Sequence, residues 1–173
     1  MKIILFVCVH NAGRSQMAEA LLNKMAAERA LPVRAESAGT VAGTEINPVA
    51  RQVMDEIGVL MVGQSPKMLT QAMADSASKV ITMGCGVDAD LCPARIHLSE
   101  DWGLDDPKGQ SIEKVRQIRD QIAAKVEKLL AESESALLVQ VWADGMLPVR
   151  WNIRHCVRPG CSFGDRASSR RRR

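Results

Sequence analysis

The sequence lacks several features that would place it in a specialised class of protein. None of its apolar runs approaches the roughly 20 residues of a transmembrane helix, which argues against a membrane span. It has no tyrosine and only two phenylalanines, so few rings are available to line a pocket for an aromatic substrate. Its five cysteines are an odd number without the spacing of a disulfide scaffold. We therefore expect a soluble cytoplasmic protein whose cysteines are thiols.

The chain has 173 residues, 46% of them hydrophobic, which is enough for one sizeable core and short for two. Charge divides it into two parts. Residues 132–173 hold 8 of the 23 Lys and Arg residues and 4 of the 20 Asp and Glu residues, so this segment carries +4 and residues 1–131 carry −1. We predict a domain over 1–131 and a basic, flexible C-terminal extension over 132–173. The negative charge of the domain argues against a nucleic-acid function.

Hydrophobic patterning predicts strands that alternate with helices. The run IILFV at residues 3–7 is typical of a central strand in a parallel sheet that is covered on both faces. Further strands are expected at 32–37, 79–83 and 96–98. Strands and helices in alternation predict an α/β layer fold.

Capping residues and apolar spacing predict three main helices. The first follows the first strand, with Ser15 as its N-cap, and the second begins at Asn47-Pro48. The third covers residues 112–130, where apolar residues fall on one stripe. The helical pattern then ends, and LLVQVW at residues 137–142 could form a strand.

The most informative stretch is CVHNAGRSQ, which begins at Cys8 between the first predicted strand and the first predicted helix. Backbone N–H groups in such a loop can form an anion cradle at a helix N-terminus, and the same field favours the reactive thiolate form of a cysteine. Arg14 offers a planar fork for two oxygens of a tetrahedral oxyanion. Ser15 can donate to the thiolate, and Asn11 can hold an unusual backbone conformation. The predicted oxyanion-binding residues are Val9, His10, Asn11, Ala12, Gly13 and Arg14.

A plainer interpretation is that Cys8 is a buried structural cysteine and Arg14 a surface residue, since cysteine is among the most buried residue types. The combination of a strand, the six-residue spacing, Gly13 and a following helix favours an oxyanion-binding nucleophile instead. His10 could tune the reactivity of Cys8 or only fill space.

The stretches CVHNAGRS, MAEALL and ESAGT resemble the low-molecular-weight phosphotyrosine protein phosphatase superfamily over about residues 1–130. This resemblance implies a three-layer α/β/α fold with a four-stranded parallel sheet. It also implies that Asp106, in the pair Asp106-Pro107, is the general acid that protonates the leaving oxygen. The residues alone do not separate Asp106 from Asp105, because an Asp-Pro pair can simply begin a turn.

Two further cysteines, Cys85 and Cys92, follow the third predicted strand in TMGCGVDADLCPA. That loop should lie at the same carboxyl edge of the sheet as Cys8, and three thiols at one edge indicate redox chemistry. Their spacing fits a zinc site poorly. Cys156 and Cys161 with His155 form an incomplete ligand set, so no metal site is predicted.

Taken together with EDWGLDDPKGQ, these motifs are similar to those of thioredoxin-coupled arsenate reductases built on the phosphatase fold. The resemblance implies that Cys8 attacks arsenate while Asp106 protonates the departing hydroxide. Cys85 then attacks Cys8, arsenite leaves, and Cys92 attacks Cys85. The resulting Cys85–Cys92 disulfide is reduced by thioredoxin, and the enzyme serves arsenic detoxification. Phosphate and sulfate should compete with arsenate.

Two other functions stay open at this point. A tyrosine phosphatase would use the same loop, but it usually has an aromatic residue after the Asp-Pro pair, where this chain has Lys108. A non-enzymatic binder of trivalent arsenic or a soft metal would need the thiolates but not Arg14, Ser15 or Asp106. The resemblance leaves glutaredoxin or mycothiol as other electron donors, and a monomer is the default expectation.

The resemblance also raises the question of a potassium ion, which some relatives hold near the loop. Asn11, Glu19 and Ser37 match three of the residues used there, and no fourth can be identified. A potassium ion is therefore unsupported by the sequence, and no cofactor is expected to be required.

Overall fold

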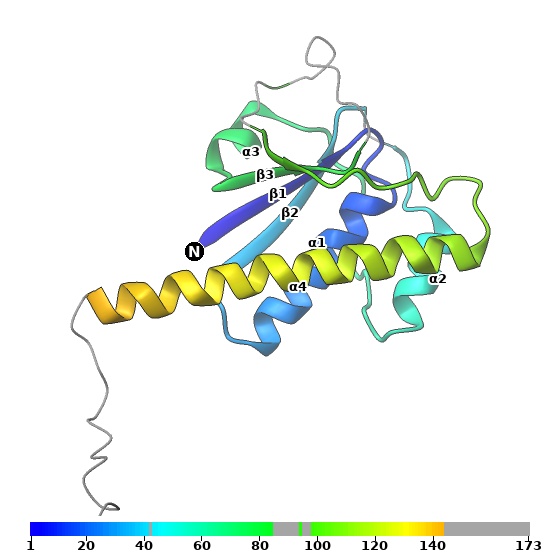
Figure 1. Ribbon diagram of the computed structural model, residues 1–173. Helices are drawn as coiled ribbons and strands as arrows, with labels where there is room; N and C mark the ends of the chain where they lie inside the picture. The colour runs from blue at the N-terminus through cyan, green and yellow to red at the C-terminus, as the bar shows by residue number, and fades with distance from the viewer. Residues whose placement is uncertain (42, 85–93, 95–97, 144–173) are drawn as a thin grey trace, which may run out of the picture.

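Four parallel strands form the centre of the computed structural model, which describes residues 1–41, 43–84, 94 and 98–143. The strand order across the sheet is β2-β1-β3-β4 (Figure 1). The strands β1 and β3 are central, and β2 and β4 are the edge strands. Their bounds are Lys2–Cys8 for β1, Val33–Gly39 for β2, Lys79–Thr82 for β3 and Leu98–Asp101 for β4. The predicted α/β fold with a four-stranded parallel sheet is confirmed.

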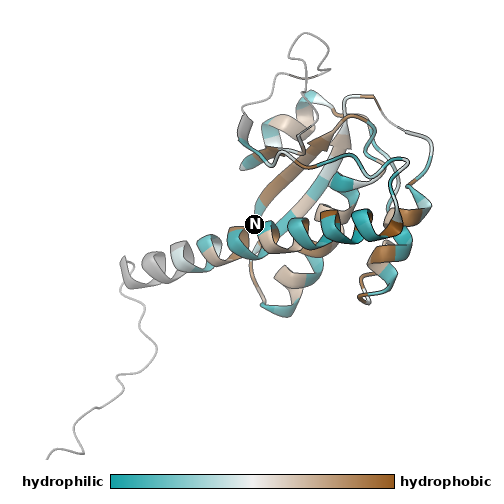
Figure 2. Ribbon diagram, turned by 45° about the vertical axis from the view of Figure 1, so that its right-hand side comes forward, coloured by the Kyte–Doolittle hydropathy of each residue, from teal (hydrophilic) through white to brown (hydrophobic). Residues whose placement is uncertain are grey.

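The continuous apolar run of β1 serves two cores, because successive side chains of a strand point to opposite faces of the sheet. Ile4 and Phe6 belong to the main core, whereas Leu5 and Val7 belong to a smaller core on the other face. All four side chains are buried. The middle of the sheet is accordingly brown, the colour of hydrophobic residues, in Figure 2.

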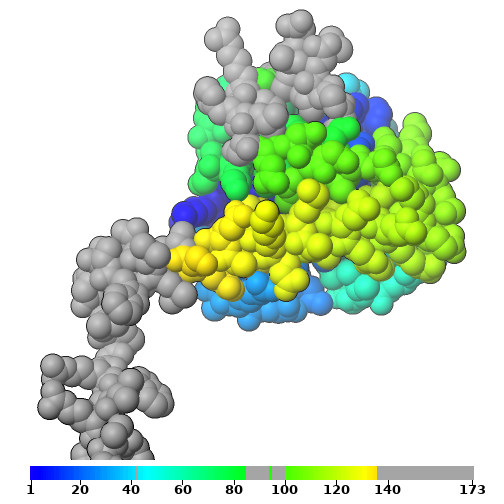
Figure 3. All heavy atoms as spheres, viewed as in Figure 1, coloured from blue at the N-terminus to red at the C-terminus, as the bar shows by residue number. Residues whose placement is uncertain are grey.

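Helices cover both faces unequally. α1 (Arg14–Glu28), α2 (Pro48–Asp55) and α4 (Ile112–Ala143) contribute to the main core, and the short α3 (Gln71–Ser76) packs on the smaller one. α4 lies across the molecule between the β3–β4 region and the helices α1 and α2 (Figure 3). The described segments that follow β1, β2 and β4 meet at the carboxyl ends of the strands.

The predicted bounds of the fourth strand and the predicted cap of the first helix are wrong. The fourth strand runs over Leu98–Asp101 rather than 96–98, where residues 96 and 97 lie outside the described part of the chain. β4 is an edge strand, and its backbone pairing with β3 does not require an apolar sequence. Ser15 does not cap α1, because Gly13 occupies the N-cap position and Ser15 lies in the first turn. Its hydroxyl bonds to the Cys8 sulfur atom instead.

The predicted cap of α2 is confirmed, whereas the structure has a short helix, α3, that the sequence does not predict. Asn47 caps α2, where its side chain accepts hydrogen bonds from the N–H groups of Val49 and Ala50. The helix α3 was not predicted, since six residues are too few to show a period of 3.6. Its cap is Thr70, whose hydroxyl accepts from the Met73 N–H.

The last helix is longer than predicted. α4 continues past residue 130, where the predicted helix ends, as far as Ala143. Residues 137–142, which could have formed a strand, are therefore helical, because adding a residue to an existing helix costs far less than starting a new element. The helix crosses residue 131 without a break, and residues 144–173 of the predicted extension lie outside the described part. Within that part, no helix combines the length and apolar character that crossing a membrane requires.

Candidate active site

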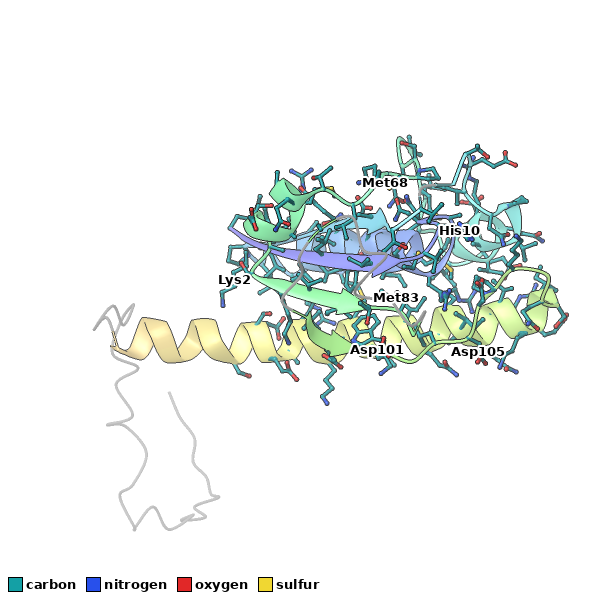
Figure 4. All side chains as sticks on the ribbon, turned by 90° about the horizontal axis from the view of Figure 1, so that it is seen from above. Lys2, His10, Met68, Met83, Asp101 and Asp105 are labelled. Carbon is teal, nitrogen blue, oxygen red and sulfur yellow. The ribbon has the colours of Figure 1, made fainter. Side chains whose placement is uncertain are left out.

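The loop from Cys8 to Arg14, called here the oxyanion loop, connects β1 to α1 at the carboxyl edge of the sheet. Figure 4 shows His10 and Asp105 toward this end of the molecule, away from Lys2 at the start of β1. A cavity of about 440 Å³ opens there. Its lining includes residues of the oxyanion loop, of the chain before α2 and of the chain before α4: Cys8, His10, Ala12, Gly13, Arg14, Gly43, Thr44, Glu45, Asn47, Pro48, Asp106, Pro107 and Lys108.

Cys8 lies at the base of this cavity with two polar groups on its sulfur atom. Its Sγ is 2.9 Å from Ser15 Oγ and accepts a hydrogen bond from the Asn11 N–H at 3.1 Å. The side chain is buried, at 4% exposure. Hydrogen bonds to sulfur stabilise a thiolate, which is the nucleophilic form of cysteine. The backbone N–H of Asn11, a residue predicted to bind the oxyanion, thus donates to the Cys8 sulfur.

The carbonyl groups of the loop point away from the cavity. Val9, His10 and Ala12 each accept a hydrogen bond through the backbone oxygen, from the N–H groups of residues 41, 43 and 47 at 2.7–2.8 Å. Because each peptide unit is planar, a carbonyl that faces outward turns the following N–H inward. This orientation is compatible with the anion cradle of backbone amides that the position of the loop before a helix predicts.

The loop also needs close support from β2. A Cβ atom at Gly39 would lie 2.6 Å from the Val9 backbone oxygen and 2.9 Å from the Asn11 backbone nitrogen. Any side chain there would displace the oxyanion loop. The glycine of the stretch ESAGT is thus explained by packing beneath the cradle.

Behind the cradle, Asn11 is the centre of a buried hub that comprises Asn11, Ser15, Ser37, Glu19 and Lys67. Asn11 has a positive φ of 50° and no exposed surface, and asparagine tolerates this conformation better than most residues. Its Nδ2 donates to Ser15 Oγ at 2.9 Å and to Ser37 Oγ at 2.8 Å. Its Oδ1 accepts from Gln16 Nε2 and from the Lys67 N–H, both at 2.8 Å.

The hub ends in an ion pair that sequence reasoning missed. Ser37 Oγ donates to Glu19 Oε2, and the Lys67 ammonium lies 3.4 Å from Glu19 Oε1. Lys67 is 56 positions from Asn11 in a stretch without clear patterning, so only the fold brings it there. A larger hollow of about 590 Å³ lies outside this ion pair, and its described lining residues include no cysteine.

The hub does not fit a potassium ion. Asn11, Glu19 and Ser37 do lie together, as the resemblance implied. However, Asn11 presents N–H groups rather than an oxygen to Ser37, and its Oδ1 already accepts two hydrogen bonds. Glu19 has a cation beside it in the Lys67 ammonium. No group of three or more His, Cys, Asp or Glu side chains suited to a metal occurs among the described residues.

Arg14 is buried at the opposite side of the cradle, where backbone oxygens fix its guanidinium. Nη1 donates to the backbone oxygens of Met83 at 3.0 Å and Leu104 at 2.8 Å, and Nη2 donates to Asp106 Oδ2 at 3.2 Å. Nε makes no hydrogen bond within the described part of the chain, and with the second Nη2 hydrogen it forms an edge that can bind two oxygens of an oxyanion.

The structure distinguishes the two adjacent aspartates. Asp106 lines the cavity, with Oδ2 on Arg14 and Oδ1 accepting from the Lys108 N–H at 3.0 Å. Asp105 faces α4, where its carboxylate lies 2.6 Å from the Lys114 ammonium. The hydrogen bond and charge of Lys114 lower the pKa of Asp105, so this carboxyl stays ionised and away from the cavity. Asp106 is the one placed to reach a substrate.

The structure thus brings three of the six predicted catalytic residues, Cys8, Arg14 and Asp106, to one cavity. A fourth, Ser15, is fully buried and lies against the Cys8 sulfur. Cys85 and Cys92 lie outside the described residues, as do Cys156, Cys161 and His155. The chain enters the segment of Cys85 from Met83, whose backbone oxygen binds Arg14.

Comparisons with known proteins agree with this geometry. The family described as low molecular weight phosphotyrosine protein phosphatase matches residues 3–137. A curated relative, the glutaredoxin arsenate reductase of Synechocystis sp., is 35% identical over 133 residues, which are 76% of this chain and 98% of the relative.

Two solved structures have a similar fold. An arsenate reductase in the phosphate-binding state superposes with a TM-score of 0.66 at 35% identity, over 76% of this chain and 98% of the other. The thioredoxin-dependent arsenate reductase of Corynebacterium glutamicum gives 0.64 at 34% identity, over 79% of this chain and 63% of the other. From its sequence, its sheet and its oxyanion loop, the chain belongs to the low molecular weight phosphotyrosine protein phosphatase family.

Proposed function

We propose that the chain is an arsenate reductase that converts arsenate to arsenite in the cytoplasm, as part of arsenic detoxification. The observation that carries this proposal is the Cys8 sulfur at the base of an amide cradle, with Arg14 and Asp106 on one side. Arsenate has the shape and charge of phosphate, so phosphate and sulfate should compete for the cradle. The names of the relatives support arsenate as the substrate.

The first step is nucleophilic displacement at arsenic. The Cys8 thiolate attacks arsenate held by the loop amides and Arg14, and a sulfur–arsenic bond forms as an arsenic–oxygen bond breaks. Asp106, in its protonated form, gives its proton to the departing hydroxide, which leaves as water. Arg14 and the amides stabilise the negative charge on the remaining oxygens. Ser15 holds the sulfur in position through its contact of 2.9 Å.

The second step reduces arsenic by two electrons and uses the predicted relay. The Cys85 thiolate attacks the Cys8 sulfur, the electron pair of the sulfur–arsenic bond passes to arsenic, and arsenite leaves. Cys92 then attacks Cys85, which releases the Cys8 thiolate and leaves a Cys85–Cys92 disulfide. What supports this step is that Met83 and Gly84 lie next to Arg14 and the segment 101–104, so the chain leaves β3 beside the cavity.

Thioredoxin is the proposed electron donor, and the enzyme is proposed to act as a monomer without a resident cofactor. One structural relative is named for thioredoxin and one curated relative for glutaredoxin, so the donor needs a direct test. The Lys67 ammonium beside Glu19 supports the absence of a potassium requirement. Turnover in potassium chloride should accordingly equal turnover in sodium chloride at the same ionic strength.

Two other functions are less well supported. A tyrosine phosphatase would gain from rings around its cavity, and the described residues that line this one include no Phe, Trp or Tyr. A passive binder of arsenic or a soft metal would not need Arg14 tied to Asp106. Arg14→Ala would leave such binding intact but would abolish a reductase.

The test is arsenate-dependent oxidation of NADPH through thioredoxin reductase and thioredoxin, compared with a glutathione and glutaredoxin system. We expect turnover with thioredoxin, and none in Cys8→Ser, Cys85→Ser or Cys92→Ser. Full turnover in Cys92→Ser would refute the three-thiol relay. Turnover only with glutaredoxin would reassign the donor, and hydrolysis of a phosphate ester without arsenate reduction would favour the phosphatase.

A further inference from the structure

Gly13, the residue of the oxyanion loop just before Arg14, is in close contact with the ring of Pro107. A Cβ atom at position 13 would lie 2.9 Å from Pro107 Cγ and 3.9 Å from Pro107 Cδ. Carbon atoms in van der Waals contact are separated by about 3.5–4.0 Å. The proline ring therefore occupies the space of a side chain that Gly13 does not have. The reaction proposed above gives no role to either residue.

Among the described residues, only Pro107 limits the space at position 13. Apart from the immediate chain neighbours, no other atom of this part of the chain lies within 4 Å of the added Cβ. A methyl group there would press on Pro107 rather than on the Cys8 sulfur or on the outer supports of the loop. The proline ring is rigid, so the chain that carries Pro107 would have to move.

Pro107 is buried, although Asp105, Asp106 and Lys108 around it are exposed. Residues 104–108, called here the acid segment, are otherwise tied to the site through polar contacts of Leu104 and Asp106 with Arg14. Asp106 and Pro107 are joined by a planar peptide bond, so the position of the ring and that of the carboxylate are coupled.

We propose that Gly13 is a positioning residue for Asp106, resting on the proposed role of Asp106 as general acid. Because Gly13 has no side chain, the Pro107 ring packs directly on the oxyanion loop, and this contact sets the distance from the Asp106 carboxylate to the oxyanion. A side chain at position 13 would hold the acid segment away from the substrate, while the amides that bind the oxyanion would keep their places.

The test is a double-mutant cycle of Gly13→Ala, Pro107→Ala and the combined variant, with kcat and KM for arsenate measured in the thioredoxin-coupled assay. We expect Gly13→Ala to lower kcat roughly 30-fold, a part of what a general acid contributes, with KM within about 3-fold. Pro107→Ala removes the Cγ and Cδ atoms that the methyl would meet. In that background the same Gly13→Ala change should cost less than about 3-fold, so that removing the ring rescues the added methyl.

A crystal structure of each variant tests the proposal without an activity measurement. The distance from Arg14 Nη2 to Asp106 Oδ2, 3.2 Å in the wild type, should exceed 3.5 Å in Gly13→Ala and return in the combined variant. Equal losses from Gly13→Ala in both backgrounds, or an unmoved Asp106 in Gly13→Ala, would overturn the proposal. If the wild type does not reduce arsenate, the proposed function fails, while the crystal structures still decide whether Gly13 positions Asp106.

Discussion

The two sides of the oxyanion loop are built differently. The buried hub behind it is closed to solvent at Asn11, Ser15 and Ser37, and its members are joined mainly by hydrogen bonds between neutral groups. In the acid segment in front, the carboxylates of Asp105 and Asp106 are exposed, and 56% of the Asp106 side chain is accessible. Ion pairs to Arg14 and Lys114 hold them. We infer that the hub sets the shape of the cradle and the acid segment supplies chemistry that can be removed without unfolding the chain.

Asn11→Ala tests the hub most severely. The substitution removes four hydrogen bonds of a fully buried side chain, and we expect a loss of about 3–4 kcal/mol in the free energy of unfolding. Urea unfolding measures the stability, and calorimetric titration with phosphate should show that oxyanion binding is lost as well.

Asn23→Ala is the matched control for that prediction. Asn23 makes two hydrogen bonds to the backbone of Ala35, away from the cradle. It should cost about 1 kcal/mol of stability and leave phosphate affinity unchanged. Equal effects of the two substitutions on phosphate binding would contradict a special role for the hub.

Asp106→Asn tests the opposite side of the loop. Without a proton to donate, turnover of arsenate should fall roughly 100-fold, which is typical of losing a general acid. Stability should change by less than about 0.5 kcal/mol, because the carboxylate is exposed and its ion pair is screened by water. The neighbouring Asp105→Asn should lower turnover by less than about 3-fold. A similar loss in both variants would show that the structure does not separate the two acids as we describe.

Lys67→Met tests the ion pair at the outer end of the hub. Glu19 is 12% exposed, but Lys67 is 41% exposed, so we expect a loss of only about 0.5–1 kcal/mol at low salt, decreasing in concentrated sodium chloride. Lys24→Met removes a comparable ammonium from the surface pair with Glu28 and should have almost no effect. An effect of Lys67→Met that does not depend on salt would point to packing rather than charge.

The smallest effect concerns acid stability at the carboxyl end of β3. A hydrogen bond from the Thr82 hydroxyl, supported by the Gly84 N–H, lowers the pKa of Asp101 below its usual 3.8. Because the pKa of Asp101 is lower in the folded than in the unfolded protein, its carboxylate stabilises the fold at any pH above the pKa of the unfolded protein. This stabilisation is lost as the pH falls through the pKa of the folded protein. The stability difference between wild type and Asp101→Asn, from urea unfolding, should be constant near neutral pH and shrink below pH 3.8. A difference that persists at lower pH would contradict the assignment.

The sequence was most informative where a feature is local. The apolar run of β1, the Asn47 cap and the oxyanion loop all depend on residues within a few positions of one another. The fourth strand and α3 escaped this kind of reasoning, because β4 is formed by pairing with β3 and α3 is too short to show a period. The helix α4 extends beyond its predicted end at residue 130, because lengthening a helix costs less than starting a new element.

The candidate site divides in the same way. Cys8, Arg14 and Ser15 are close in the chain, so the sequence identifies them together. Ser15 had a second possible use as a helix cap, and only the position of the Cys8 sulfur decides between the two.

What the sequence by itself determined is the sheet with its central apolar strand and the loop of thiol, amides and guanidinium that follows. These depend on periodicity and on short spacings that a linear pattern records. Tertiary structure alone decided that Asp106 rather than Asp105 faces the cavity, that Lys67 closes the hub, and that Pro107 packs on Gly13. Each of these contacts joins residues more than 40 positions apart, and their distance in space depends on the packing of the whole core.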